Sequence, residues 1–239
     1  MVVNTEKFKE TEKIIKNILI RENGTVLPDK ALDIIKSIGI RTPAYVLVKT
    51  VKEAIEASKA IGFPVVLKIA SPDVLHKSDV GGVVIDVKSE EEVAENYHKV
   101  MDNLAGVVSD ARIKGVLVQK QAQQATQVII GGIMDEQFGP AVMFGLGGVF
   151  VELFKDVSFR IAPVTETEAL EMIKEIKGYP ILSGYRGAKM LDIPQLTKAI
   201  VTISELISSL DEIKEVELNP LLVYEKGITT VDARIILES

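Results

Sequence analysis

Residues 68–83 have the sequence KIASPDVLHKSDVGGV, and this stretch decides how the rest of the chain can be interpreted. An apolar run, residues 64–70, carries a single lysine, Lys68, and stops at a Ser-Pro pair. A polar loop follows and closes at two glycines, residues 81–82, before a second apolar run at 83–87. The pattern predicts a strand, a loop that can approach phosphate oxygens, and a second strand.

The composition excludes several classes of protein. The 239 residues carry a net charge of −6, and 47% of them are hydrophobic, which is enough for a sizeable core. The negative charge argues against nucleic acid or an anionic membrane as the main partner. A chain without cysteine forms no disulfide, thiolate metal site or cysteine nucleophile. The charged N-terminus is unlike a signal peptide and no apolar run approaches the ~20 residues that span a bilayer, so we expect a cytoplasmic protein.

Hydrophobic periodicity predicts helices and strands along the whole chain. The expected helices cover residues 5–20, 28–38, 50–60, 89–104, 165–176 and 193–210. The expected strands cover residues 44–48, 64–70, 82–87, 115–119, 127–134, 140–145, 215–223 and 228–237. Residues 179–191 are expected to be irregular. This order indicates an α+β fold with two parts, residues 1–120 (N-terminal helices and a first lobe) and residues 121–239 (a second lobe), joined near a polar hinge at 120–126.

Three features of the opening stretch could bind or transfer a phosphate. Lys68 would offer a flexible cation to a nucleotide phosphate, although a lysine at a sheet edge can also extend its amine to solvent. The loop at 77–82 offers backbone N–H groups, but most Gly-Gly pairs are ordinary turns, and the loop is neither GxxxxGK[ST] nor GxGxxG. His76 has no second His or Cys nearby, so it is either a surface histidine or a base or nucleophile that could accept a phosphoryl group.

The last two predicted strands carry three oxygen-bearing side chains on one face. Glu217 and Asn219 are two residues apart and therefore share a face. If four residues (224–227) connect the strands, Asn219 lies directly across from Asp232; with two connecting residues the pair is diagonal, and an odd number separates them. The set suits Mg²⁺, which completes its coordination with phosphate and water, although a solvated hairpin face could carry the same residues.

Five segments together resemble the ATP-grasp domain of NDP-forming acyl-CoA synthetases, in particular the β-subunit branch of the ADP-forming acetyl-CoA synthetases. They are PVVLK (64–68), HKSDVGGV (76–83), VIIGGIMDEQFGPAVMFGLGG (128–148), VELNPLLV (216–223) and VDARI (231–235). The resemblance covers about residues 25–237. It implies an ATP-grasp fold with two lobes and the nucleotide between them.

The resemblance also implies roles for individual residues. His76 would be a phosphohistidine carrier that passes a phosphoryl group to ADP, and Glu217 would act beside the two Mg²⁺ ligands, Asn219 and Asp232. The positions implied to contact ATP or ADP are Lys68, Ser78, Gly81, Gly82, Val118, Gln119 and Gln127. The last of these departs from the family, because Gln127 stands where relatives often have glutamate.

The implied reaction, acetyl-CoA + ADP + phosphate giving acetate + ATP + CoA, requires a second polypeptide. An α subunit would carry the CoA site and form the acyl phosphate, so we expect a hetero-oligomer that binds neither nucleic acid nor membrane. Two alternatives are another ATP-grasp ligase, such as a succinyl-CoA synthetase-like subunit, and a nucleotide-binding regulatory module of an acyltransferase. Lys68, Asn219 and Asp232 favour turnover over sensing. Residues 179–191 are a candidate partner contact.

Overall fold

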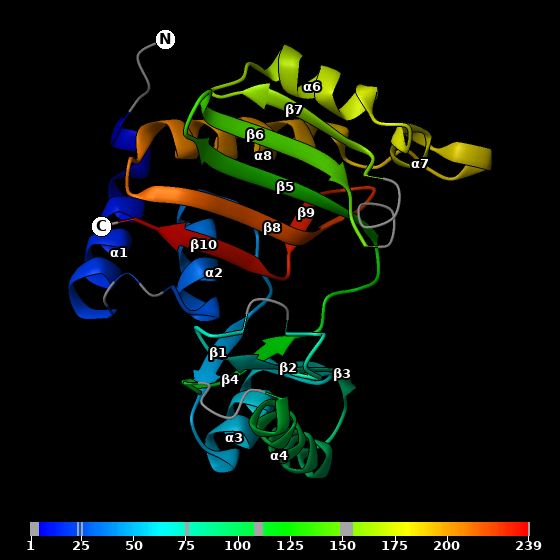
Figure 1. Ribbon diagram of the computed structural model, residues 1–239. Helices are drawn as coiled ribbons and strands as arrows, with labels where there is room; N and C mark the ends of the chain where they lie inside the picture. Colours follow the sequence, from blue (N-terminus) through cyan, green and yellow to red (C-terminus); the bar gives the residue numbers. More distant parts are fainter. Residues whose placement is uncertain are drawn as a thin grey trace. The chain divides into compact units, whose positions relative to one another are not determined.

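The computed structural model describes residues 5–22, 24, 26–74, 77–107, 112–148 and 155–238, and these residues form two compact units (Figure 1). Unit 1 comprises Met1–Val26, Lys30–Thr42 and Gln124–Ser239, and unit 2 comprises Leu27–Asp29 and Pro43–Gln123. The expected division kept residues 1–120 together. The N-terminal helices instead group with the C-terminal half of the chain.

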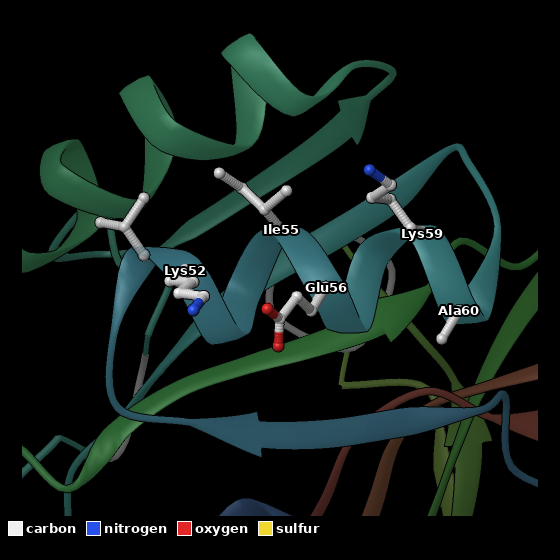
Figure 2. A pocket seen from close by; sticks show the side chains of 6 residues that line it. Lys52, Ile55, Glu56, Lys59 and Ala60 are labelled. Carbon is white, nitrogen blue, oxygen red and sulfur yellow. The ribbon is translucent and has the colours of Figure 1, made fainter.

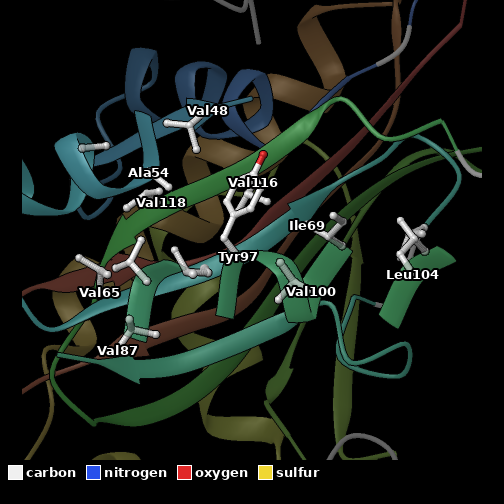
Figure 3. Close-up of a cluster of buried hydrophobic side chains, with 14 residues drawn as sticks. Val48, Ala54, Val65, Ile69, Val87, Tyr97, Val100, Leu104, Val116 and Val118 are labelled. Carbon is white, nitrogen blue, oxygen red and sulfur yellow. The ribbon is translucent and has the colours of Figure 1, made fainter. Parts of the chain in front are cut away.

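Unit 2 contains an antiparallel sheet with helices on one face. Among the described residues its strand order is β1 (Tyr45–Val48), β4 (Gly115–Lys120), β2 (Val65–Ala70) and β3 (Val83–Val87). Helices α3 (Val51–Ile61) and α4 (Glu90–Val107) pack against this sheet. The core between them takes every second residue of β2, namely Val65, Leu67 and Ile69 (Figure 3). The intervening residues of β2 therefore point to the other face of the sheet.

Local signals in the sequence set both ends of α3. Thr50 and Glu53 form the predicted capping box: the Glu53 N–H donates to the Thr50 hydroxyl at 3.2 Å, and the Glu53 carboxylate accepts the Thr50 N–H at 3.2 Å. Gly62 ends the helix with φ of 84°, a conformation that glycine adopts at little cost. The expected helix is confirmed, and its stop places β2 directly after it.

Unit 1 is built on a larger antiparallel sheet. Among the described residues its strands are β5 (Thr126–Asp135), β6 (Gly139–Leu146), β7 (Val157–Ile161), β8 (Ile213–Val223), β9 (Ile228–Thr230) and β10 (Ala233–Leu237). The order is β10-β8-β5-β6-β7, and β9 pairs with β8. Helices α6 (Glu166–Glu175) and α8 (Ile193–Ser209) pack on one face (Figure 1). Among the described residues, no helix of the C-terminal half packs on the opposite face of this sheet.

The N-terminal helices, apart from the first two residues of α2, belong to unit 1, and contacts from this N-terminal segment support that grouping. They are η1 (Thr5–Phe8), α1 (Lys9–Glu22) and α2 (Pro28–Ser37). Lys7 forms an ion pair with Glu205 of α8, and the Thr230 N–H of β9 donates to the carbonyl of Arg41 at 2.9 Å. Periodicity alone predicted these helices but could not indicate which sheet they join.

Three expectations from periodicity need correction. Strand β7 was not expected, because it is only five residues long and follows a glycine-rich segment without a turn signal. The expected strand 228–237 is two strands, interrupted at residues 231–232. Within 179–191 the chain forms a short helix, α7 (Tyr179–Ser183), and a 3₁₀ turn, η2 (Tyr185–Gly187). A glycine with φ of 100°, Gly184, ends α7 and separates the two.

No helix in the described part of the chain is long and apolar enough to cross a bilayer.

Candidate functional site

In unit 2, Lys68 and Gln119 lie on the face of the sheet opposite α3 and α4. Lys68 pairs with Leu117, and Gln119 pairs with Val66, so Lys68 and Gln119 are diagonal neighbours on one face. They are 6% and 1% exposed, respectively. The amide nitrogen of Gln119, Nε2, is buried and has no hydrogen-bond partner among the residues described. A buried donor of this kind is costly unless a ligand or water satisfies it, so this face is suited to a polar ligand.

Val118 points the other way. Its side chain is fully buried in the core with α3 and α4. Its backbone lies in the ladder between β1 and β2, where it is opposite Val46 and Leu67. Of the two adenine-facing positions that the family resemblance implied, only Gln119 presents its side chain on the Lys68 face.

The glycines of the opening stretch form a tight turn. The Gly81 N–H donates to the Ser78 carbonyl at 3.1 Å, and the Gly82 N–H donates to the Lys77 carbonyl at 2.8 Å. A Cβ at position 82 would lie 2.5 Å from Cγ2 of Ile69, so this position requires glycine. The two amides therefore donate within the turn in this structure, whereas the sequence suggested that backbone N–H groups of this loop are offered to a phosphate. Ser78 remains exposed on the loop.

Two contacts outside the predicted set hold this loop. Asn103 of α4 donates from Nδ2 to the carbonyl of Gly81 at 2.9 Å. Arg112 binds the Asp73 carboxylate through its backbone N–H at 2.7 Å and through guanidinium nitrogens at 3.2 and 2.8 Å. These hydrogen bonds from Arg112 lower the pKa of Asp73 from 3.8 to about 2. Residues 75 and 76 lie outside the described residues, so no geometry is assigned to His76.

In unit 1, the C-terminal hairpin has the register that places its polar residues together. Val223 pairs with Ile228 and Leu218 pairs with Ala233, so four residues connect the strands and Asn219 lies opposite Asp232. The Asn219 N–H donates to the Asp232 carbonyl at 3.3 Å. The Asn219 side chain donates from Nδ2 to Oε1 of Glu217 at 3.0 Å. The four-residue alternative from the sequence is the correct one.

A β-bulge in β8 lies at this point of the hairpin. Along β5 the pairing passes from Val128 to Ile130 over one residue, whereas along β8 it passes from Leu221 to Leu218 over two. The extra residue falls at Asn219–Pro220, and it lets both flanking leucines stay fully buried while Asn219 is exposed. Bulges commonly redirect a side chain next to a functional site, and this one turns Asn219 outward beside Asp232.

Gln127 lies at the same end of the sheet. It is exposed, two residues before Ile129 on β5, and its carbonyl accepts the Gly147 N–H at 2.8 Å. A Cβ at Gly147 would come within 3.1 Å of Gln127. The second glycine-rich stretch therefore approaches the start of β5 closely, beside the bulge.

The donor set of the hairpin fits Mg²⁺. Among the described residues no group of three His, Cys, Asp or Glu side chains is placed to hold a metal ion. This argues against a closed all-protein cage, whereas Mg²⁺ commonly takes one or two protein oxygens and completes its octahedron with water and phosphate. Asp232 would supply a carboxylate oxygen and Asn219 its amide oxygen, with Glu217 adjacent.

Neither of two surface pockets contains a predicted site residue. One, of about 890 Å³, is an open hollow on α3 lined by Val51, Lys52, Ile55, Glu56, Lys59 and Ala60 (Figure 2). The other, of about 440 Å³, lies in unit 1 between residues 38–41, the first turns of α8 and residues 226–228. The predicted site residues lie outside both pockets. Lys68 and Gln119 are on one face of the unit 2 sheet, and Asn219 and Asp232 are at the hairpin of unit 1.

Comparison with known proteins assigns the family. The ATP-grasp domain family matches residues 18–237, which is most of the chain. The chain belongs to the ATP-grasp family.

Close relatives of this ATP-grasp chain are acyl-CoA synthetases. The β subunit of ADP-forming acetate–CoA ligase I from Pyrococcus furiosus is 48% identical over 90% of this chain and 93% of the relative. The ADP-forming acetate–CoA ligase I of Archaeoglobus fulgidus is 43% identical over 98% of this chain, but over only 34% of its own length.

Solved structures agree. The dinucleotide forming acetyl-coenzyme A synthetase 1 of Ca. Korarchaeum cryptofilum, in complex with coenzyme A and Ca-AMPCP, has a TM-score of 0.90 at 47% identity and covers 96% of this chain and 100% of that chain. A second structure of that protein contains Mg-AMPPCP and a phosphohistidine segment that points towards the nucleotide binding site (TM-score 0.80, 45% identity, 95% and 100% coverage). The expected ATP-grasp fold is confirmed.

Proposed function

We propose that this chain is the β subunit of an ADP-forming acetyl-CoA synthetase, which makes ATP from ADP by using the energy of an acyl-CoA thioester. The observation that carries the proposal is the 48% identity to the Pyrococcus furiosus β subunit, over 93% of that protein. Lys68 lies on a paired strand of unit 2, and Asn219 and Asp232 lie on the bulged hairpin of unit 1. The presence of all three groups supports a subunit that turns over nucleotide, and not a regulatory module.

The nucleotide would contact unit 2 through the face of its sheet opposite α3 and α4. The Lys68 ammonium would neutralise phosphate charge, and the unsatisfied Gln119 Nε2 would donate to the base. Ser78 would contact phosphate from the loop, with Gly81 and Gly82 shaping that loop. Val118 would act only through the strand that positions Gln119, and Gln127 would face the nucleotide from unit 1.

The metal would be held by the hairpin of unit 1. Mg²⁺ bound by Asp232 and Asn219 would supply charge neutralisation between nucleotide phosphates. Glu217 accepts the Nδ2 hydrogen of Asn219, which leaves the amide oxygen of Asn219 for the ion. Glu217 would therefore act by orienting a ligand beside the transferring group.

His76 would be the phosphoryl carrier of this chain. In the ATP-forming direction, the N–P bond of phosphohistidine breaks, a β-phosphate oxygen of ADP forms the new O–P bond, and the imidazole returns to its neutral form. No oxidant or additional reactant is needed. The protein's contribution is to position the groups and to neutralise charge.

The acyl phosphate and CoA chemistry would occur on a second polypeptide. The Archaeoglobus fulgidus relative contains this chain's counterpart in 34% of its length, so about two thirds of that protein has no counterpart here. An α subunit carrying those functions would form a hetero-oligomer with this chain and select the acid. A cytoplasmic location remains part of this proposal.

Phosphoryl labelling tests the proposal. The chain is purified with its α subunit, and ATP synthesis from acetyl-CoA, ADP and phosphate is measured together with labelling of this chain by γ-³²P-ATP. His76→Ala should abolish both while ADP still binds. His98→Ala is the matched control, because His98 is the other histidine of the chain and is exposed on α4.

The outcomes separate the parts of the proposal. Full ATP synthesis by His76→Ala would remove the carrier role and leave the subunit assignment intact. If the wild-type pair binds ATP but synthesises none, the regulatory-module alternative is favoured and the proposed function fails.

A further inference from the structure

The face of the unit 1 sheet opposite α6 and α8 carries an apolar surface on β5, β6 and β7. Two rows of paired residues cross these strands: Gly131 pairs with Met143, and Met143 with Phe159; Ile133 pairs with Ala141, and Ala141 with Ile161. Paired residues share a face of the sheet. We define Ile133, Met143, Phe159 and Ile161 as the apolar face.

The alternation along β7 shows that these side chains point away from the helices. Ser158 donates to the Met172 carbonyl of α6 at 3.0 Å, and Arg160 forms an ion pair with Glu175 of α6 at 2.7 Å. Phe159 and Ile161 occupy the alternate positions and are 57% and 56% exposed, and Ile133 is 49% exposed. Phe138, in the turn between β5 and β6, is 69% exposed.

Such exposure is costly for a lone chain. Aromatic residues make up only 5% of the sequence, yet two of its seven phenylalanines are exposed in this part of one sheet. Scattered exposed apolar residues need no explanation, but a contiguous patch on adjacent strands is typical of an interaction surface. Strand β7 is also a sheet edge, since it pairs only with β6 among the described strands.

The apolar face continues into the candidate metal site. Gly131 pairs with Met143 on one side and with Glu217 on the other, so one row runs from Phe159 to Glu217. The next row contains Asn219 and Asp232. A protein seated on the apolar face would therefore lie beside the groups proposed to hold Mg²⁺.

We propose that the apolar face docks the second subunit, the polypeptide that corresponds to the part of the Archaeoglobus fulgidus relative with no counterpart in this chain. The inference rests on the proposed function. Two observations select this occupant: about two thirds of that relative lies outside the matched region, and the proposed reaction requires a phosphoryl group to arrive from outside this chain at the row that holds Asn219 and Asp232. Docking covers the exposed phenylalanine and isoleucine side chains. It also brings the partner to the end of the sheet where the phosphoryl group must arrive.

Binding of the two purified subunits, measured by isothermal titration calorimetry, tests this inference. Phe159→Lys and Ile161→Lys should each raise the Kd for the α subunit by about tenfold or more, as expected for apolar anchors at the centre of an interface. Phe159→Thr, which keeps a strand-forming residue, should have the same effect in a smaller measure. Ile20→Lys is the matched control, because Ile20 is 78% exposed on α1 of unit 1; the Kd of this variant should change less than about threefold.

Four further results decide the matter. Each variant should keep the wild-type Tm and ADP affinity, which excludes a loss of fold. An unchanged Kd in both β7 variants, or an equal change in Ile20→Lys, overturns the docking surface but not the proposed function. A wild-type chain that does not bind the α subunit overturns both. Self-association of the isolated chain that is abolished by Phe159→Lys, measured by light scattering, would assign this face to a second copy and also overturn the inference.

Discussion

The two sheets hold their functional side chains in opposite ways. In unit 2, Lys68 and Gln119 are 6% and 1% exposed, and the ladder between their strands, β2 and β4, is regular; β2 has a register shift only on its other side, against β3, between Val65 and Leu67. In unit 1, Asn219 is exposed at a β-bulge and Asp232 lies in a break between β9 and β10. The first arrangement fixes side chains by burial, and the second by a local departure from the ladder.

The difference matters because burial and exposure have different costs. A buried polar group lowers stability unless it is satisfied, so replacing it with an apolar group of similar size can preserve the fold while removing function. An exposed group at a bulge contributes little to the core, so its replacement should affect only the ligand that it holds. Stability and activity should therefore respond in distinguishable ways in the two units.

The largest effect is expected at the hairpin. Asp232→Ala should reduce ATP synthesis by on the order of 100-fold and raise the Mg²⁺ concentration needed for half-maximal rate, because a charged ligand beside the transferring phosphoryl group is lost. The Tm should change little. Mg²⁺ titrations of the initial rate measure this effect. Asp211→Ala is the control, since Asp211 is an exposed carboxylate in the turn before β8. An unchanged Mg²⁺ dependence in Asp232→Ala would remove the metal assignment.

The next effect separates two lysines of the same small sheet. Lys68→Met should raise the Kd for ADP about tenfold or more, the value of a charged hydrogen bond of roughly 1.5–3 kcal/mol, and should shift the Tm by at most about 5 °C. Lys120→Met should have the opposite pattern, with a lower Tm and an unchanged Kd for ADP. The Lys120 ammonium donates to the carbonyls of Gly62 and Phe63 at 3.0 and 2.7 Å, so its loss should lower the Tm while ADP affinity stays the same.

Calorimetric titration with ADP and thermal melts of both variants give the four numbers required. If both lysine variants lose ADP affinity and stability together, the Lys68 face is a structural feature and the contrast between the two sheets fails.

Regular geometry is what the sequence predicted well. Alternation along β2 places Lys68 opposite the core, and the spacing of Glu217, Asn219 and Asp232 requires only a four-residue connection to bring the last two together. Both follow from the two-residue period of a strand, which needs no knowledge of distant contacts. For Val118 the family resemblance implied a position in the chain without indicating which face its side chain takes, and that side chain lies in the core.

Three features of the two sites could not be predicted from hydrophobic periodicity. The Gly81 carbonyl is held by Asn103 from the next helix, and nothing in the spacing of the two residues indicates this. The glycine amides looked available for phosphate, but Lys77 and Ser78 carbonyls accept them within the loop. The bulge at Asn219–Pro220 also leaves no periodic signal, because a single extra residue only shifts the alternation.

The smallest effect concerns the ion pair that holds the loop of unit 2. Arg112 lowers the pKa of Asp73 to about 2, below its unfolded value near 3.8, so the pair contributes stability above about pH 4 and loses that contribution as the pH falls through 2. Asp73→Asn should therefore have a lower Tm than wild type at pH 6, and the difference should already be clearly smaller at pH 2.5, because the contribution declines as the pH falls from about 4 towards 2. Melts across this range measure it, with Arg112→Gln expected to match and the double variant to add nothing. A Tm difference that stays constant from pH 6 to 2.5 would mean that Asp73 stabilises the loop through its shape and not through its charge. The ion pair with Arg112 would then contribute nothing to the stability of unit 2.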